Sequence, residues 1–238
     1  MFNDTEKYVI NLKRRPDRLD AVLKEFDYVG MDVKVFEAID TNSFLGATQS
    51  HKTIIQSALD NKLEQVIVFE DDVMFMPYAK SLLIDIEEAV KNIEYGILNL
   101  NPAFHTPVNL SSVNRLLIDL TNRPPSLPNH RGVYGAGFMV YHKSVYEDIL
   151  NTEHVHALDY EIDLRIYPKY PCYSPAIPIG CSTNGVSDVS GVFFNTYYTQ
   201  TYNWNLYCPD KIPSGYLNED YVVNLRKNGV IDYKTLLK

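Results

Sequence analysis

The chain has 238 residues, of which 45% are hydrophobic and 22% charged, which is the composition of an ordinary globular protein with a sizeable core. Its formal net charge of −8 argues against a broad basic surface, so nucleic acid is not expected as a partner. The three cysteines form no CxxC pair and indicate neither a disulfide framework nor a zinc site. Because the start of the chain lacks signal-peptide features and no apolar run is long enough to span a membrane, a soluble, cytoplasmic protein is expected.

The first hundred residues alternate between strand and helix patterns. Strands are predicted where short apolar runs occur, at 8–12, 33–36, 66–69 and 97–100. Between them, apolar residues recur at helical spacing behind Pro16, around Ile54 and from Leu82 to Ile93. Such an alternation is typical of an α/β fold, in which a mostly parallel central sheet has helices on both faces. In such sheets ligands bind beyond the carboxyl ends of the strands.

The alternation stops near Pro102. From there to Arg131 five prolines interrupt the chain, so an insertion or mobile loop is expected. Regularity returns with a strand predicted at 137–141 and a short helix at 145–150. No polar linker divides the sequence, so residues 1–238 are expected to form a single domain.

The strand predicted at 66–69 is followed directly by three carboxylates, Glu70, Asp71 and Asp72. Adjacent like charges at the end of a buried strand are unfavourable unless water or a cation compensates them. One interpretation is a solvated loop. The other is a site for Mg²⁺ or Mn²⁺, because these hard cations prefer carboxylate oxygens and commonly share them with substrate phosphates.

Four segments together resemble glycosyltransferase family 25, the lipopolysaccharide-type galactosyltransferases and their collagen galactosyltransferase relatives. They are NLKRRPDR at 11–18, AID at 38–40, LGATQSH at 45–51 and FEDDV at 69–73. The resemblance is strong from about Tyr8 to Val73, and it continues more weakly through 95–99, 132–141, 157–159 and 187–189. The first segment and the acidic triplet, in this order and spacing, are the most specific parts.

The resemblance implies a GT-A (Rossmann-like) fold with a nucleotide-sugar-binding half at 1–100 and an acceptor-side half at 101–238. It also implies an inverting hexosyltransferase that moves galactose or glucose from a UDP-sugar to a hydroxyl of a glycan, glycolipid or glycoprotein, with Mn²⁺ or Mg²⁺ as cofactor. The triplet falls on the family's DxD-type motif, with Asp72 holding the metal and Glu70 the metal or the donor ribose. Elementary chemistry agrees, because a cation on the phosphates stabilises the negative charge of a departing nucleoside diphosphate.

Donor-binding residues are expected at the same edge of the sheet, namely Asn11, Leu12, Arg15, Arg18, Asp40, Ser50, His51, Glu70 and Asp71. Arg15 and Arg18 match the family motif, and a guanidinium can contact two phosphate oxygens at once. For Lys13 and Arg14, the alternative to phosphate binding is that they belong to a solvated basic face of the helix. Ser50 and His51 are adjacent on a predicted helix and point in different directions, so His51 is not expected to serve as a base for Ser50 in a hydrolase. The resemblance implies instead that both face the donor.

An inverting transfer also needs a base for the acceptor hydroxyl. The candidates are Asp159, Glu161 and Asp163, of which Asp159 matches the family's late acidic position. The alternative to a catalytic role is that these three acids lie on an exposed edge of a strand or helix. Asp188 is a candidate metal or donor ligand.

Two departures from the family's sequence pattern leave the identity of the donor sugar open, since Phe44 and Ala47 stand where the family often has an acidic residue and a cysteine.

A catalytically degenerate GT-A module that binds carbohydrate or nucleotide is the alternative function, although the intact triplet argues against it. A phospho-acceptor signalling domain also places an acidic pair after a strand, but there the pair follows the first strand, whereas two predicted strands precede the triplet here.

Overall fold

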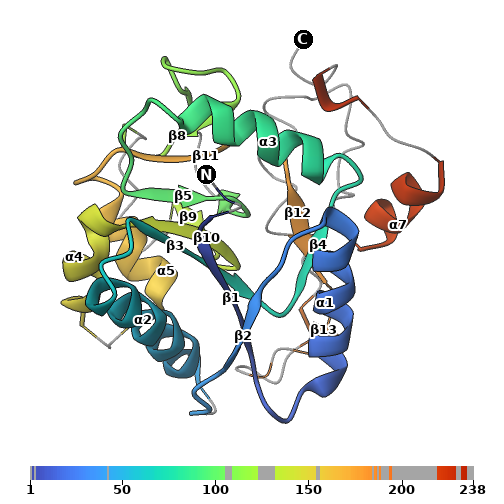
Figure 1. Cartoon of the computed structure of the whole chain (residues 1–238), viewed down its shortest axis with the longest axis horizontal. Coiled ribbons are helices and arrows are strands. Elements are labelled where there is room, and N and C mark those ends of the chain that lie inside the picture. The colour runs from blue at the N-terminus through green and yellow to red at the C-terminus, as the bar shows by residue number, and fades with distance from the viewer. Residues whose placement is uncertain are drawn as a thin grey trace.

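The computed structural model describes residues 2, 4–41, 43–104, 109–122, 132–153, 156–183, 185–186, 188, 193–194, 219–228 and 232–234. Its centre is an eight-stranded sheet with the order β2-β1-β3-β10-β5-β11-β8-β7 (Figure 1). These strands are β1 (Glu6–Asn11), β2 (Lys34–Glu37), β3 (Gln65–Glu70), β5 (Ile97–Asn99), β7 (Asn109–Leu110), β8 (Leu117–Asp119), β10 (Phe138–His142) and β11 (Cys172–Pro175). Short additional pairs are formed by β4 (Val73–Phe75) with β12 (Gly180–Ser182), β6 (Ala103–Phe104) with β9 (Val133–Tyr134), and β13 (Gly185–Val186) with β14 (Phe193–Phe194).

The predicted α/β fold is confirmed, including the strand at 137–141. β1 pairs in parallel with both β2 and β3, so the carboxyl ends of these three strands meet at one edge of the sheet. β10 runs antiparallel between β3 and β5, and β8 is also reversed, so six of the eight strands share one direction. The antiparallel insertion of β10 brings the loop before it, around Gly137, against the end of β3.

Helices cover both faces of the sheet, as the strand–helix alternation predicts. They are α1 (Pro16–Val29), α2 (Phe44–Asp60), α3 (Ala79–Val90), α4 (Tyr146–Leu150), α5 (Leu158–Glu161) and α7 (Glu219–Asn228), with short helical turns η1 (Lys143–Val145) and η2 (Ile162–Ile166). Apolar residues of α1, α3 and α7 pack in one core and those of α2, α4 and α5 in the other. Figure 1 shows α2, α4 and α5 together on the side of the sheet away from α1 and α7.

The acidic triplet lies in a tight turn that the sequence pattern did not reveal in full. β3 ends at Glu70, and after two turn residues the chain enters β4, which pairs with β12. The turn is fixed at both ends, because the N–H of Glu70 donates to the carbonyl of Gly137 (3.0 Å) and the N–H of Thr183 donates to the carbonyl of Asp72 (2.6 Å). The three carboxylates therefore project from a backbone that is hydrogen-bonded on either side.

The proline-rich segment contains β6, β7 and β8 in its described part, and residues 105–108 and 123–131 of it lie outside the described residues. The same is true of 195–218 in the Tyr-rich C-terminal third. None of the described helices has the length and hydropathy that crossing a membrane would need.

Candidate functional site

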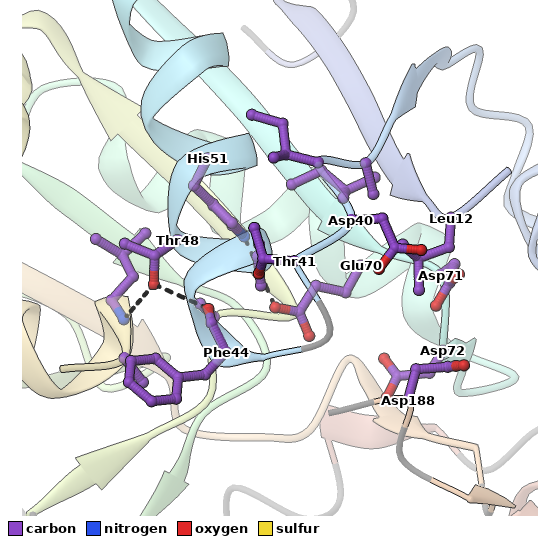
Figure 2. Close-up of a pocket in the computed structure, with 18 of the residues that line it drawn as sticks. Leu12, Asp40, Thr41, Phe44, Thr48, His51, Glu70, Asp71, Asp72 and Asp188 are labelled. Carbon is purple, nitrogen blue, oxygen red and sulfur yellow. Dashed lines mark hydrogen bonds and ion pairs between the residues drawn. The ribbon is translucent and has the colours of Figure 1, made fainter. Parts of the chain in front are cut away.

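A cavity of about 480 Å³ opens at the carboxyl edge of β1, β2 and β3. Its walls come from the residues that follow these strands, from the first turns of α2, and from the start of α5. Figure 2 shows the acidic side chains and the α2 residues that surround it. The sheet edge at which the sequence predicted a ligand site therefore does open into a cavity.

Asp71 is held by its neighbours. Its Oδ2 accepts a hydrogen bond from the Asn11 amide (2.6 Å) and its Oδ1 pairs with the Arg18 guanidinium (3.1 Å). The Asn11 amide also donates to the carbonyl of Arg15 (3.1 Å), so it ties the end of β1 to the start of α1. Burial raises the pKa of Asp71, and the two donors act in the opposite direction. With both oxygens occupied, Asp71 serves to orient Arg18.

Asp72 is different, because its buried Oδ1 has no hydrogen-bond partner among the described residues. Burial raises the pKa of Asp72 to about 7, and the charges of Glu70 and Asp71 add to the effect. An unpaired buried carboxylate oxygen is costly in a folded protein and calls for a ligand or a functional explanation.

Gly137 shows where that oxygen points. A Cβ placed on this glycine would lie 4.0 Å from Oδ1 of Asp72 and 3.9 Å from Oε2 of Glu70. Two carboxylate oxygens and the amide nitrogen of Asn101, which would lie 3.9 Å away, thus surround the space beside Gly137 that a side chain would otherwise fill.

The residues fit a divalent cation that binds together with phosphates. Among the described residues, no three His, Cys, Asp or Glu side chains are grouped as a complete metal cage. Mg²⁺ and similar hard cations are, however, usually held by one or two carboxylates plus substrate phosphates. Glu70 and Asp72 supply such a pair, and the unpartnered Oδ1 of Asp72 is the observation that favours it.

Three arginines gather at the start of α1. Arg14 and Arg15 each contact a different oxygen of Asp188, at 2.8 and 2.5 Å, and Arg18 lies 3.8 Å from the second of these. Arg14 also pairs with Asp40 (3.1 Å). Guanidinium groups at a helix start form a good site for a phosphate, and here a carboxylate occupies it.

The cavity as a whole carries excess negative charge. Two guanidinium groups line it, those of Arg14 and Arg18. Six carboxylates line it, namely Asp40, Glu70, Asp71, Asp72, Asp159 and Asp188. A diphosphate entering this cavity would meet like charges unless a cation accompanies it, which again favours a metal-bound ligand.

The first turns of α2 shape the opposite wall. The Ser50 hydroxyl accepts from the N–H of Ile39 (2.9 Å) and donates to the carbonyl of Gly46 (2.7 Å), and Ser50 is fully buried. A Cβ on Gly46 would lie only 2.2 Å from the carbonyl oxygen of Ile39, so a glycine is needed for this close approach. The predicted donor-binding Ser50 thus holds the 38–41 loop against α2 and does not line the cavity.

His51 lines the cavity from α2 although only 1% of it is exposed. Its Nδ1 lies 3.1 Å from the hydroxyl of Tyr141 on β10, and its Nε2 lies 3.7 Å from Oε1 of Glu70. Figure 2 shows the imidazole directed toward that carboxylate.

The three candidate bases have different surroundings. Asp159 lines the cavity, and its oxygens accept from the N–H groups of Gly135 (3.1 Å) and Tyr160 (2.9 Å). Glu161 is 1% exposed and pairs with Arg165 (2.7 Å). Neither it nor Asp163 lines the cavity.

The surroundings of Asp163 are those of a structural carboxylate. It is fully buried and accepts from two consecutive backbone N–H groups, those of Gly132 and Val133, both at 3.0 Å. On the other wall, Thr48 of α2 accepts from the N–H of Leu158 (3.1 Å) and so fixes the helix start that carries Asp159. Of the three acids, Asp159 is the one presented to a ligand.

The structure brings most of the predicted residues into one cavity. Those that line it are Leu12, Arg18, Asp40, His51, Glu70, Asp71, Asp72, Asp159 and Asp188. Those that do not are Asn11, Arg15, Ser50, Glu161 and Asp163. Arg14, for which a solvated face was the alternative, lines the cavity, whereas Arg15 does not. Gly137 and Tyr141 carried no signal of their own, because a glycine before a strand and an aromatic within one are ordinary features.

Comparisons with known proteins show similarity to one enzyme family. Residues 41–122 match the family model Glycosyltransferase family 25 (LPS biosynthesis protein). A Glycosyltransferase 25 family member of Aedes aegypti is 28% identical over 36% of this chain and 19% of its own length. Procollagen galactosyltransferase 2 of Mus musculus is also 28% identical, over 36% of this chain and 18% of its own length. The matched part spans about a fifth of these curated relatives.

Among solved structures, a glycosyltransferase involved in the glycosylation of the major capsid of PBCV-1 aligns with a TM-score of 0.45 and 14% identity. It covers 71% of this chain and 80% of that chain. The inositol-1-phosphate CTP transferase of T. maritima aligns with a TM-score of 0.40 and 17% identity, over 71% and 66%. The family match confirms the resemblance drawn from the sequence for residues 41–122, and the relatives named here are described as a glycosyltransferase family member and a galactosyltransferase.

Proposed function

We propose that this chain is a metal-dependent, inverting hexosyltransferase of the family 25 type. Its donor is a UDP-sugar, with galactose or glucose as the sugar, and its acceptor is a hydroxyl of a glycan, glycolipid or glycoprotein. One observation carries the proposal: Asp72, whose Oδ1 has no hydrogen-bond partner among the described residues, lines with Glu70 the cavity that also holds the guanidinium groups of Arg14 and Arg18. The match of residues 41–122 to the family supplies the reaction class.

Each side chain has a defined part in this proposal. Arg14 and Arg18 bind the diphosphate oxygens, since guanidinium groups contact phosphate in bidentate fashion and Asp71 fixes the orientation of Arg18. Glu70 and Asp72 would hold the cation, Mn²⁺ or Mg²⁺, which neutralises charge on the departing diphosphate. For the diphosphate to reach the arginines, Asp188 must leave its contacts with Arg14 and Arg15.

The transfer step needs a proton acceptor near the acceptor hydroxyl, and we assign this role to Asp159, the one of the three candidate acids that lines the cavity. As the acceptor oxygen bonds to the anomeric carbon, the bond from that carbon to the diphosphate oxygen breaks. The hydroxyl proton passes to Asp159 and the bond electrons leave with UDP. Residues 1–100 then form the donor half of the domain and 101–238 contribute the acceptor side.

The test is release of UDP from a panel of UDP-sugars, with Mn²⁺ and with chelator in its place. We expect release from UDP-galactose or UDP-glucose that requires the metal and that Asp72→Asn lowers about a hundredfold, as for loss of one transition-state stabiliser. Metal-dependent UDP binding without turnover would instead indicate a degenerate binding module. Absence of both binding and release would overturn the proposal.

A further inference from the structure

A line of three side chains leads from the core to the acidic cluster. It comprises Tyr141 of β10, His51 of α2 and Glu70 at the end of β3. The Tyr141 hydroxyl lies 3.1 Å from Nδ1 of His51, and Nε2 on the other side of the ring lies 3.7 Å from Oε1 of Glu70. The ring is 1% exposed, and its Nε2 has no hydrogen-bond partner among the described residues. A nearly buried polar atom is thus aimed at a carboxylate in the cavity (Figure 2).

Tyr141 is suited to act as a hydrogen-bond donor in this line. Its side chain is fully buried, and the hydrogen-bond partner that the described residues give its hydroxyl is His51. Burial, followed by nearby groups that include Glu70 and Asp159, raises the pKa of Tyr141 well above its usual value. The phenol therefore keeps its hydrogen.

The arrangement of lone pairs selects one neutral form of His51. If Nδ1 carried the ring hydrogen, the lone pair of the buried Nε2 would face the lone pairs of Glu70 Oε1. If Tyr141 donates to Nδ1, the hydrogen lies on Nε2 and faces the carboxylate. The second form removes the repulsion and satisfies the phenol hydrogen. At 3.7 Å the Nε2–H group is still beyond normal hydrogen-bond length, so it is available to close on Oε1 when Oε2 takes a ligand.

We propose that Tyr141 is a positioning residue, which holds His51 with its hydrogen on Nε2 and through it holds Oε1 of Glu70. Oε2 is thereby left for the ligand, on the side of Gly137 where Oδ1 of Asp72 also lies. The inference deepens the proposed function and rests on it for the nature of the ligand, a metal-bound nucleoside diphosphate. Groups that orient a ligating side chain are worth about tenfold to a hundredfold in metal affinity.

The test removes one hydroxyl at a time. Tyr141→Phe deletes the donor to His51 with little change in volume. Tyr146→Phe is the matched control, because Tyr146 is also fully buried, belongs to the same apolar core and has a hydroxyl without a hydrogen-bond partner among the described residues. Calorimetric titration of the full chain with UDP in Mn²⁺ should show affinity about tenfold to a hundredfold weaker for Tyr141→Phe and unchanged for Tyr146→Phe. Equal affinity in the two variants would overturn the proposal.

A second readout follows the ring itself. Long-range ¹H–¹⁵N correlation spectra of the labelled chain, with His51 identified by its absence in His51→Gln, should show hydrogen on Nε2 in the wild type and loss of this preference in Tyr141→Phe. Hydrogen on Nδ1 in the wild type, or an unchanged pattern in Tyr141→Phe, would contradict the proposal. These spectra do not depend on ligand, so a wild-type protein that fails to bind UDP with Mn²⁺ would overturn the proposed function while the spectra still decide the role of Tyr141.

Substitution of His51 separates positioning from packing. His51→Gln keeps an amide that can donate toward Glu70, whereas His51→Leu fills the space without a donor. If His51 acts through its hydrogen, the glutamine variant should retain more affinity for UDP in Mn²⁺ than the leucine variant. Equal losses in two variants of equal thermal stability would show that only packing matters and would overturn the proposal.

Discussion

Gly137 and Glu70 face each other across the junction of β10 and β3. The N–H of Glu70 donates to the carbonyl of Gly137 at 3.0 Å, and a Cβ on the glycine would lie 3.9 Å from Oε2 of the same glutamate. At that distance an added methyl group makes ordinary contacts and no clash. It would, however, take up space beside both carboxylates, because the same Cβ would lie 4.0 Å from Oδ1 of Asp72.

Gly137→Ala should therefore separate stability from ligand binding. We expect the free energy of unfolding to stay the same or rise by up to about 1 kcal/mol, because alanine restricts the unfolded chain. Binding of UDP in Mn²⁺ should fall at least about tenfold, since the methyl group crowds the ligand that Glu70 and Asp72 would hold. Thermal melts and calorimetry measure the two effects.

The comparison variant for this prediction is Gly180→Ala. A Cβ at Gly180 would lie 2.6 Å from the carbonyl oxygen of Met74, so this variant should lose stability through a clash outside the cavity. If Gly137→Ala binds UDP and Mn²⁺ as the wild type does, the cation does not lie between Glu70 and Asp72.

Asp72→Asn should change the pH dependence of stability in the metal-free protein. The pKa of Asp72 in the folded chain is about 7 against an ordinary value of 3.8, so over this range the unfolded chain releases the proton while the folded chain keeps it. The free energy of unfolding therefore falls as pH rises through this window. In chelator, Asp72→Asn should be more stable than wild type at about pH 8, and its advantage should disappear near pH 4.

The neighbouring Asp71→Asn is the matched contrast. Because Asp71 binds both Asn11 and Arg18, its replacement should destabilise the chain at neutral pH by about 1–3 kcal/mol. Melting curves at several pH values distinguish the two. An Asp72→Asn protein less stable than wild type at pH 8 would mean that Asp72 has a partner when no metal is present.

The strands and helices near the N-terminus were predictable because each carries a plain hydrophobic period. Val66 to Phe69 is a continuous apolar run and proved to be a central strand, and Pro16 does begin α1. β4 was missed because its three residues follow the acidic turn directly, and too few residues remain to show a period. The antiparallel placement of β10 between β3 and β5 depends on long-range pairing, which no local pattern reports.

Within the site, the sequence indicated residue types but not their directions. Arg14 and Arg15 are adjacent on the chain, and only the geometry at the start of α1 shows that the first of them lines the cavity. Glu161 and Asp163 alternate with apolar residues like Asp159, yet Glu161 at the end of α5 and Asp163 in η2 are both buried. The contact of Tyr141 with His51 joins residues 90 positions apart and is likewise invisible to periodicity.

Arg18→Ala should weaken the thermal stabilisation that UDP gives in the presence of Mn²⁺. A ligand that binds only the folded chain raises its melting temperature by mass action. Loss of a phosphate contact weakens UDP binding, so a smaller fraction of the folded chains carries UDP and the melting temperature rises less. Lys13→Ala is the control, because Lys13 lies in the same segment, has a side chain that is 82% exposed and does not line the cavity. Melting curves with UDP, with and without Mn²⁺, measure the effect. Equal shifts with metal and with chelator would mean that the phosphates do not meet the carboxylates.

The choice of base rests on the contrast between Asp159 and Asp163. Both accept backbone N–H groups, but Asp159 lines the cavity, whereas Asp163 is fully buried and uses both oxygens to hold Gly132 and Val133.

Asp159→Asn should retain the UDP-induced thermal shift and lose transfer, because the amide cannot take the acceptor proton although donor contacts are intact. Asp163→Asn should instead lower the free energy of unfolding by about 1–3 kcal/mol, because its amide group cannot accept one of the two backbone hydrogen bonds. Rates of sugar transfer and melting temperatures measured on both variants separate a chemical role from a structural one. Wild-type transfer by Asp159→Asn, with transfer lost in a stably folded Glu161→Gln or Asp163→Asn, would move the role of base to that neighbour.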